Sequence, residues 1–170
     1  MACSKFSTPM WQELQRFSAL ESRERGTFLR AAAILPLISA SLRLRGFRKT
    51  QAFLQRFLSH PSPPGNAAGP QKMSPRTELS TESTARMVRA AGRRSLGRAT
   101  CLEESLTLWW LLGRQGVGSE LRVGVRKNGE KFEAHAWVEC AGMALNEQEA
   151  AHTHYAAFDA ALASLPPVAR

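Results

Sequence analysis

Cys101 and His135 are the two side chains of this 170-residue chain whose types and local settings fit a nucleophile and its base. The order Thr100-Cys101-Leu102-Glu103 predicts a capping box that begins a helix at the cysteine. Unpaired N–H groups and the positive end of the helix dipole stabilise a thiolate there. Thr100 and Leu102 would support this helix start and an oxyanion. A cysteine in an apolar helix is otherwise an inert core residue, and that alternative stays open.

His135 lies in the segment FEAHAWVE, whose alternation predicts a strand. One face would carry Phe132, Ala134, Ala136 and Val138, and the other would carry Glu133, His135, Trp137 and Glu139. A cysteine at a helix start and a histidine in mid-strand make the arrangement that a nucleophile pair needs. The imidazole would take the thiol proton and later protonate the leaving amine. A buried structural histidine is the alternative.

A third residue should orient the imidazole, and two neighbours downstream of the strand are candidates. Glu147 is the nearest downstream carboxylate that could reach back, and Asn146 is its competitor. We therefore predict Cys101, His135 and Glu147 as catalytic residues.

Cysteine usage argues against disulfides and metal sites. The cysteines at positions 3, 101 and 140 are widely spaced, form no CxxC pair and come with no secretory signal. A reducing cytoplasm fits this pattern better than a disulfide framework or a zinc site does. We interpret His152 and His154 as surface residues and Cys140 as packing. No cofactor and no metal are expected.

The second half of the chain predicts an α+β layout that would position these residues. Expected in order are a helix over 81–91 with a Glu82–Arg86 pair, a helix from Cys101, strands over 121–125, 132–139 and 143–145, and a helix over 152–165. Asn128-Gly129 predicts a tight turn between the first two strands.

The first half predicts helices separated from that domain by a linker. Expected are a helix over 7–20, a helix over 21–45 that bends at Pro36 and ends at Gly46, and an apolar stripe of Phe53, Leu54, Phe57 and Leu58. Proline and glycine then accumulate from His60 onward. We predict a helical appendage over 1–59, a linker over 60–79 and a catalytic domain over 80–170.

The formal net charge of +9 favours anionic partners without choosing among them. Much of it lies at Arg86, Arg89, Arg93, Arg94 and Arg98, which form either a solvated helix face or a docking face for an acidic peptide. The charge-free stretch between Arg30 and Arg43 is shorter than the roughly 20 residues of a membrane span. We predict no transmembrane helix, and membrane association is not predicted, although the Leu- and Arg-rich segment over 42–49 would allow interfacial contact.

Taken together, TCLEESLTLWWLLGRQG, LRVGVRKNGE and FEAHAWVE resemble the leader peptidase of lasso-peptide biosynthesis over about residues 81–147. The resemblance implies a transglutaminase-like, papain-like core, in which the nucleophile helix packs on an antiparallel sheet behind a helical N-terminal appendage. It implies Cys101 as nucleophile and His135 as base. The family usually has aspartate as its third catalytic residue, where this chain has Glu147.

The resemblance also implies the reaction and its partners. A cysteine peptidase of this family removes the leader segment from a ribosomally made precursor peptide before ring closure. This chain has no counterpart of the family's small leader-binding module, so a separate leader-recognition protein and a separate ATP-dependent lasso cyclase are expected. We expect no nucleic-acid partner. Two alternatives stay open: acyl transfer to an amine by the same residues, and a non-catalytic basic module that binds nucleic acid or a membrane surface.

Overall fold

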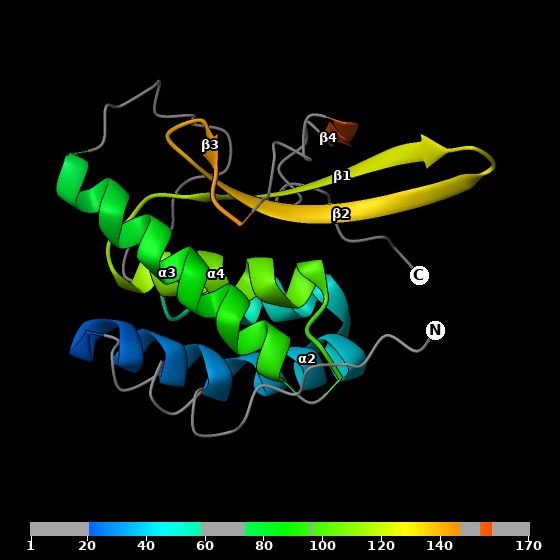
Figure 1. The fold of residues 1–170 in the computed structure, drawn as a ribbon. Helices are drawn as coiled ribbons and strands as arrows, with labels where there is room; N and C mark the ends of the chain where they lie inside the picture. The colour runs from blue at the N-terminus through cyan, green and yellow to red at the C-terminus, as the bar shows by residue number, and fades with distance from the viewer. Residues whose placement is uncertain (1–20, 59–73, 96, 147–153, 158–170) are drawn as a thin grey trace, which may run out of the picture.

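A small antiparallel sheet packs on helices in the computed structural model, which describes residues 21–58, 74–95, 97–146 and 154–157. The elements are α2 (Ser22–Gln55), α3 (Pro75–Arg94), α4 (Cys101–Arg114), β1 (Glu120–Asn128), β2 (Lys131–Cys140), β3 (Met143–Ala144) and β4 (Ala156–Ala157). The strand order is β3-β2-β1-β4. In Figure 1 the sheet is the top layer, α2 is the bottom layer, and α4 lies between them. The α+β class is therefore confirmed.

A shared core joins all three helices to the sheet. Its buried residues are Ala31 and Leu35 of α2, Ala85, Val88 and Ala91 of α3, Leu108, Leu111 and Leu112 of α4, and Val138 of β2. Burial of each larger side chain stabilises the fold by about 1.5–3 kcal/mol. The helix α2, predicted as part of a separate appendage, thus packs in the same core as the site-bearing elements.

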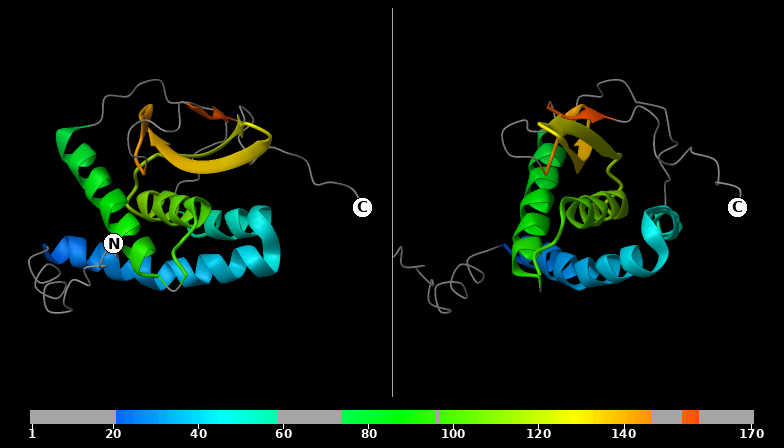
Figure 2. Two further views of the ribbon diagram at one scale, coloured as in Figure 1. Left: turned by 45° about the vertical axis from the view of Figure 1, so that its right-hand side comes forward. Right: turned by 90° about the vertical axis from the view of Figure 1, so that its right-hand side faces the viewer.

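The helical stretch predicted over 21–45 ends at Gly46, as expected. Gly46 has φ 75° and ψ 172°, and a second helical segment follows it to Gln55. Pro36 lies inside the helix, and Gly46 is where the backbone leaves helical geometry. The last part of α2, in cyan, folds back beside α4 (Figure 2). In the apolar stripe that follows Gly46, Leu54 and Leu58 are buried, whereas the phenylalanines remain exposed.

Within the described residues, α2 is the helix that is long and apolar enough, by length and composition alone, to cross a membrane. A core helix passes the same test. Ala31, Leu35 and Ile38 bury one face of α2 in the protein interior. The core therefore accounts for the apolar character of that face.

The helix α3 begins earlier than the predicted range of 81–91. Ser74 caps it by accepting a hydrogen bond from the Thr77 N–H at 3.3 Å, and Pro75 occupies the first turn, where its missing N–H costs nothing. Residues 75–79, predicted as linker, are therefore helical. Figure 2 shows α3 running from the level of the sheet down to α2.

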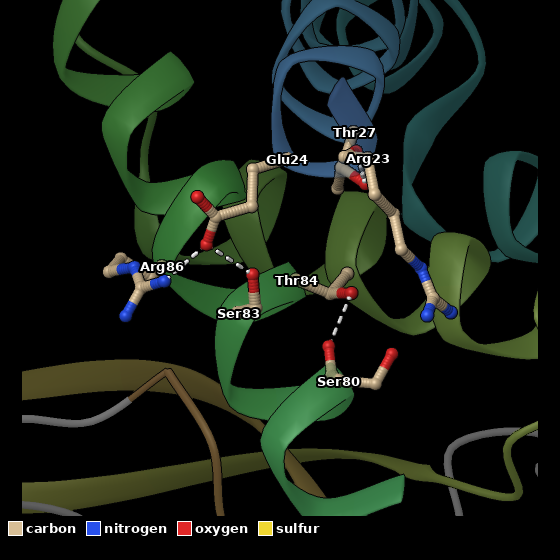
Figure 3. Close-up of polar contacts among 7 residues, drawn as sticks. All are labelled: Arg23, Glu24, Thr27, Ser80, Ser83, Thr84 and Arg86. Atoms are coloured by element: carbon tan, nitrogen blue, oxygen red, sulfur yellow. Dashed lines mark hydrogen bonds and ion pairs between the residues drawn. The ribbon is translucent and has the colours of Figure 1, made fainter. Parts of the chain in front are cut away.

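Arg86 connects α3 to α2, whereas the sequence predicted a pair with Glu82. Its guanidinium forms an ion pair with Glu24, and the Ser83 hydroxyl donates to the same carboxylate at 2.8 Å (Figure 3). The hydrogen bonds from Ser83 and Arg86 hold the pKa of Glu24 below its usual value. A contact between distant segments thus replaces the local helix pair.

The hairpin of β1 and β2 confirms the predicted strands and turn. Asn128 pairs with Lys131, so Gly129 is the first of the two central turn residues, and its φ of 62° suits glycine. The register places Gly124 directly opposite His135.

The predicted helix over 152–165 is wrong at Ala156–Ala157, which form β4 and pair with Gly124 and Val125 of β1. The free edge of β1 offers backbone partners there, and this pairing overrides the helical preference of an alanine-rich segment. The rest of that segment and the predicted helix over 7–20 lie outside the described residues.

Candidate functional site

The capping box predicted at the start of α4 is present. The Thr100 hydroxyl accepts from the Glu103 N–H at 3.3 Å, and the Glu103 carboxylate accepts from the Thr100 N–H at 2.7 Å. Burial raises the pKa of Glu103, but hydrogen bonds from Ser39 and Thr100 outweigh it and hold the pKa below its usual value. The anionic cap therefore fixes the turn that carries Cys101 and also contacts α2.

Cys101 is the first residue of α4 and its thiol is free and partly exposed. The Glu103 N–H bonds to the Thr100 hydroxyl, and the Glu104 N–H bonds to the Thr100 carbonyl at 3.0 Å. Neither bond uses the N–H groups of Cys101 and Leu102, which belong to the orphan donors of a helix start. An oxyanion formed beside the sulfur would meet these two donors.

Ser105 connects the first turns of α4 to β2 by a hydrogen bond. It lies one helical turn after Cys101, on the same face, and its buried hydroxyl donates to the Ala136 carbonyl at 2.9 Å. Ala136 is the residue after His135. The start of the helix and the middle of the strand are therefore joined by a direct hydrogen bond, close to both predicted catalytic positions.

Asn146 belongs to the same polar cluster. Its amide oxygen accepts from the Val138 N–H at 2.8 Å, and its amide nitrogen donates to the Ser105 hydroxyl at 2.8 Å. Both ends of the Asn146 amide are thus engaged in holding α4, β2 and the segment after β3 together. Glu147, the predicted third residue, lies outside the described residues.

His135 lies on the outer face of β2, as the alternation predicted. Its ring stacks with Trp137 at 6.2 Å between centroids and 16° between planes, and lies 5.2 Å from the ring of Tyr155. The Arg126 guanidinium lies over the ring of Tyr155, 4.7 Å from the ring centroid. Aromatic and cation–π contacts of this kind hold a ring in a defined orientation.

The two carboxylates that share this face with His135 have cationic partners on β1. Glu133 pairs with Arg126 at 2.6 Å, and hydrogen bonds from Asn128 and Arg126 lower its pKa. Glu139 accepts from Arg122 at 3.1 Å and from the Trp137 indole at 2.8 Å. Because both carboxylates are engaged, the outer face presents a paired charge network on either side of the imidazole.

Gly124 lets this aromatic group approach the sheet. A Cβ at this position would lie 2.9 Å from the Trp137 ring and 2.9 Å from the Tyr155 Cβ, closer than side chains normally come. Only glycine therefore leaves room for the rings on both sides of His135.

Glu104 of α4 is partly buried against Gly92 of α3. Burial raises its pKa, and the opposing fields of Arg89, Arg93 and Arg98 only partly offset that effect. A Cβ at Gly92 would lie 2.2 Å from the Glu104 carboxylate, so the two helices meet closely here. Arg89, Arg93 and Arg98 of the predicted arginine cluster thus act on the Glu104 carboxylate. Arg89 also donates a hydrogen bond to the Leu145 carbonyl at 3.4 Å.

The remaining candidates behave as structural or surface residues. Cys140 is buried, donates to the Gly118 carbonyl at 3.2 Å, and has its pKa raised by burial. His154 is exposed, and His152 lies outside the described residues. Among the residues that the structure describes, no three histidine, cysteine, aspartate or glutamate side chains come together to hold a metal ion.

Sequence reasoning missed Ser105, Gly124 and Tyr155 as parts of this site. A glycine among the β-branched residues of a predicted strand was the available signal for Gly124. Ser105 and Tyr155 contact the strand only through the tertiary fold, so no local pattern could identify them.

Comparison with known protein families matches residues 38–158, more than two thirds of the chain, to the transglutaminase-like superfamily. Searches of curated proteins and of solved structures returned no match. The matched range includes the end of α2, both of the other helices and the whole hairpin. This superfamily includes cysteine peptidases and acyltransferases, and its domains are generally catalytic. The chain belongs to the transglutaminase-like superfamily.

Proposed function

We propose that this chain is a cytoplasmic cysteine peptidase that removes the leader segment from a lasso-peptide precursor before ring closure. Cys101 is the nucleophile and His135 is the general base. The proposal rests on membership of a superfamily that includes cysteine peptidases and on the three sequence segments that resemble the lasso leader peptidase.

The observation that carries the pairing of Cys101 with His135 is the hydrogen bond from Ser105 to the Ala136 carbonyl. The residue four positions before Ser105 is Cys101, and the residue before Ala136 is His135. One helical turn spans about 5.4 Å, so the sulfur and the imidazole belong to adjoining stretches of backbone. His135 starts from the face of β2 opposite to α4, so the proposed pairing needs its imidazole to reach the sulfur around the edge of β2 that β3, paired only with Glu139 and Cys140 among the described residues, leaves open beside it.

The reaction follows from these roles. His135 accepts the Cys101 proton, and the sulfur attacks the carbonyl carbon of the scissile amide, which forms the carbon–sulfur bond. The N–H groups of Cys101 and Leu102 stabilise the oxyanion, and the imidazolium protonates the leaving amine as the carbon–nitrogen bond breaks. Water then gives its proton to His135 and cleaves the thioester, which releases a carboxylate and restores the thiol.

Glu147 is proposed to orient the imidazole. It directly follows Asn146, whose amide is committed to Val138 and Ser105. These two bonds fix the chain immediately before Glu147 against the strand that carries His135. The carboxylate would accept a hydrogen bond from the imidazole and stabilise its protonated form.

A separate leader-recognition protein would deliver the precursor, and a separate ATP-dependent cyclase would close the ring. No cofactor takes part in the proposed reaction. The exposed arginines of α3 and the loop before Cys101, including Arg93 and Arg98, would favour an acidic stretch of the bound peptide.

The test uses the full chain together with the precursor and the leader-recognition protein, and follows the products by mass spectrometry. Cys101→Ala should abolish cleavage, because it removes the nucleophile. Cys140→Ser is the matched control, since its hydroxyl can still donate to Gly118 and cleavage should persist. Leader and core peptides whose summed mass exceeds the precursor by one water support hydrolysis.

Two outcomes would contradict the proposal. Full cleavage by Cys101→Ala would exclude a thiol nucleophile at this position. Products that carry an added amine in place of water would instead identify the chain as an acyltransferase, the other activity known in the superfamily.

A further inference from the structure

The outer face of α2, opposite the core, carries a continuous apolar surface that we name the α2 stripe. It consists of Leu29, Ala33, Pro36, Leu37, Ala40 and Leu44, all of them exposed. The three leucines keep 57%, 68% and 84% of their surface. Residues three or four positions apart share one face of a helix, so these side chains form one ridge. Exposed leucines in such a row mark an interaction surface rather than an incidental feature.

The α2 stripe lies on the outside of the molecule. The helix α2 forms the bottom layer in Figure 1, and none of the elements labelled there lies beneath it. The sheet is on the opposite side. A partner bound along the stripe would therefore leave β2 and its outer face open to the solution.

Basic side chains border the α2 stripe. Arg30 follows Leu29 and Arg43 precedes Leu44, so on a helix these arginines flank the stripe on opposite sides. Further exposed cations follow its C-terminal end: Arg45, Arg48, Lys49 and Arg56. Arg45 also lies over the exposed ring of Phe53, 5.7 Å from its centroid. The surface thus combines an apolar ridge with a basic and aromatic margin.

We propose that the α2 stripe and its basic margin bind an anionic lipid bilayer, with α2 lying flat in the headgroup region. Leucines that enter the acyl boundary and arginines that remain among the headgroups are the composition of interfacial helices. Anionic headgroups attract the flanking cations. A bilayer also accepts a convex ridge, whereas a protein partner would have to offer a matching groove.

A second copy of this chain fits the surface less well. Each copy carries a formal net charge of +9, and a symmetric contact along the stripe would bring the flanking arginines of both copies together. Charge complementarity therefore favours an anionic bilayer. The inference concerns a surface remote from the sheet and does not depend on the proposed peptidase activity.

The test is co-sedimentation of the full chain with phosphatidylcholine vesicles and with vesicles that contain about one third phosphatidylglycerol. The anionic vesicles should bind the chain, and the neutral vesicles should bind it far more weakly. The double variant Leu37→Gln/Leu44→Gln should lower the partition coefficient by about tenfold or more, because the apolar contact is lost. The triple variant Arg43→Gln/Arg45→Gln/Arg48→Gln should lower it by about a hundredfold, because three headgroup attractions are lost.

Leu79→Gln is the matched control. Leu79 is 69% exposed on α3, so the substitution changes an equally exposed leucine outside the stripe, and binding should not change. Circular dichroism should show that every variant is folded at the temperature of the assay, since all these side chains are exposed. Three results would overturn the proposal: no binding to anionic vesicles, equal loss of binding in Leu79→Gln, or a dimer in light scattering that the double leucine variant dissociates.

Discussion

The two faces of β2 differ in what holds their side chains. On the inner face, Ala136, Val138 and Cys140 are buried, and Val138 packs with leucines of α4 and alanines of α2 and α3. On the outer face, His135 lies between aromatic rings and paired charges. Apolar burial alone holds the inner face, whereas on the outer face the buried ring of Trp137 is combined with directional contacts among rings and paired charges.

This difference predicts how substitutions should behave. A change on the inner face removes buried area and should lower the free energy of unfolding, with little effect on turnover of the folded enzyme. A change on the outer face should lower turnover with little effect on unfolding. The following predictions test that division, in order of expected size.

His135→Gln should have the largest effect. Loss of the general base should lower kcat/KM for leader cleavage by at least about a thousandfold. The free energy of unfolding should change by only about 1 kcal/mol, since aromatic pair contacts are of that size. Steady-state cleavage and urea unfolding measure the two quantities. Turnover close to wild type would contradict the assignment of the outer face to catalysis.

Val138→Ala should show the opposite behaviour. Val138 is fully buried in the core cluster, so its truncation should lower the free energy of unfolding by about 2 kcal/mol. Cleavage measured well below the melting temperature should stay within a fewfold of wild type. A variant with normal unfolding and abolished cleavage would show that the two faces are not functionally separate.

Gly124→Ala should affect both properties, because the added methyl group meets the Trp137 ring and the Tyr155 Cβ at 2.9 Å. Overpacking of this kind costs about 1–3 kcal/mol, and displaced rings should also lower turnover. Gly26→Ala is the control: no atom lies within 4 Å of its added Cβ, and alanine favours a helix by up to about 1 kcal/mol. Normal stability and turnover of Gly124→Ala would contradict the close packing around His135.

Glu104→Gln should have the smallest effect and should concern stability alone. Burial raises the Glu104 pKa above its usual value of 4.5, so the folded protein binds more protons than the unfolded chain just above that pH. Relative to the variant, the wild type should therefore lose stability as the pH rises through this window, because the other carboxyl groups contribute equally to both proteins. Unfolding at a series of pH values measures the difference, which should vanish below pH 4.5. A variant less stable than wild type at neutral pH would contradict this sign.

Local signals in the sequence predicted much of the region around the site. The Thr100 and Glu103 capping box, the alternation of β1 and β2, and the turn at Gly129 all follow from short-range chemistry, and each is present. The start of α3 had a local signal as well, since Ser74-Pro75 is a capping residue followed by a first-turn proline. It was missed because the surrounding prolines predicted a linker.

The features that local patterns did not predict depend on contacts between distant segments. Arg86 pairs with Glu24 across two helices, and Ala156–Ala157 join the edge of β1. The Ser105 and Asn146 bonds likewise join segments that are far apart in the chain. Tertiary pairing of this kind overrides local preference and leaves no periodic signal in one sequence.

The most direct test of the central pairing is cross-linking with dibromoacetone, a short bifunctional alkylating agent. It can join a thiol to an imidazole only when the two groups meet within a few ångströms. Mass spectrometry after proteolysis should find the peptide of Cys101 joined to the peptide of His135, and His135→Gln should abolish that product. Alkylation of Cys101 alone, or its linkage to another residue, would contradict the nucleophile and base assigned here.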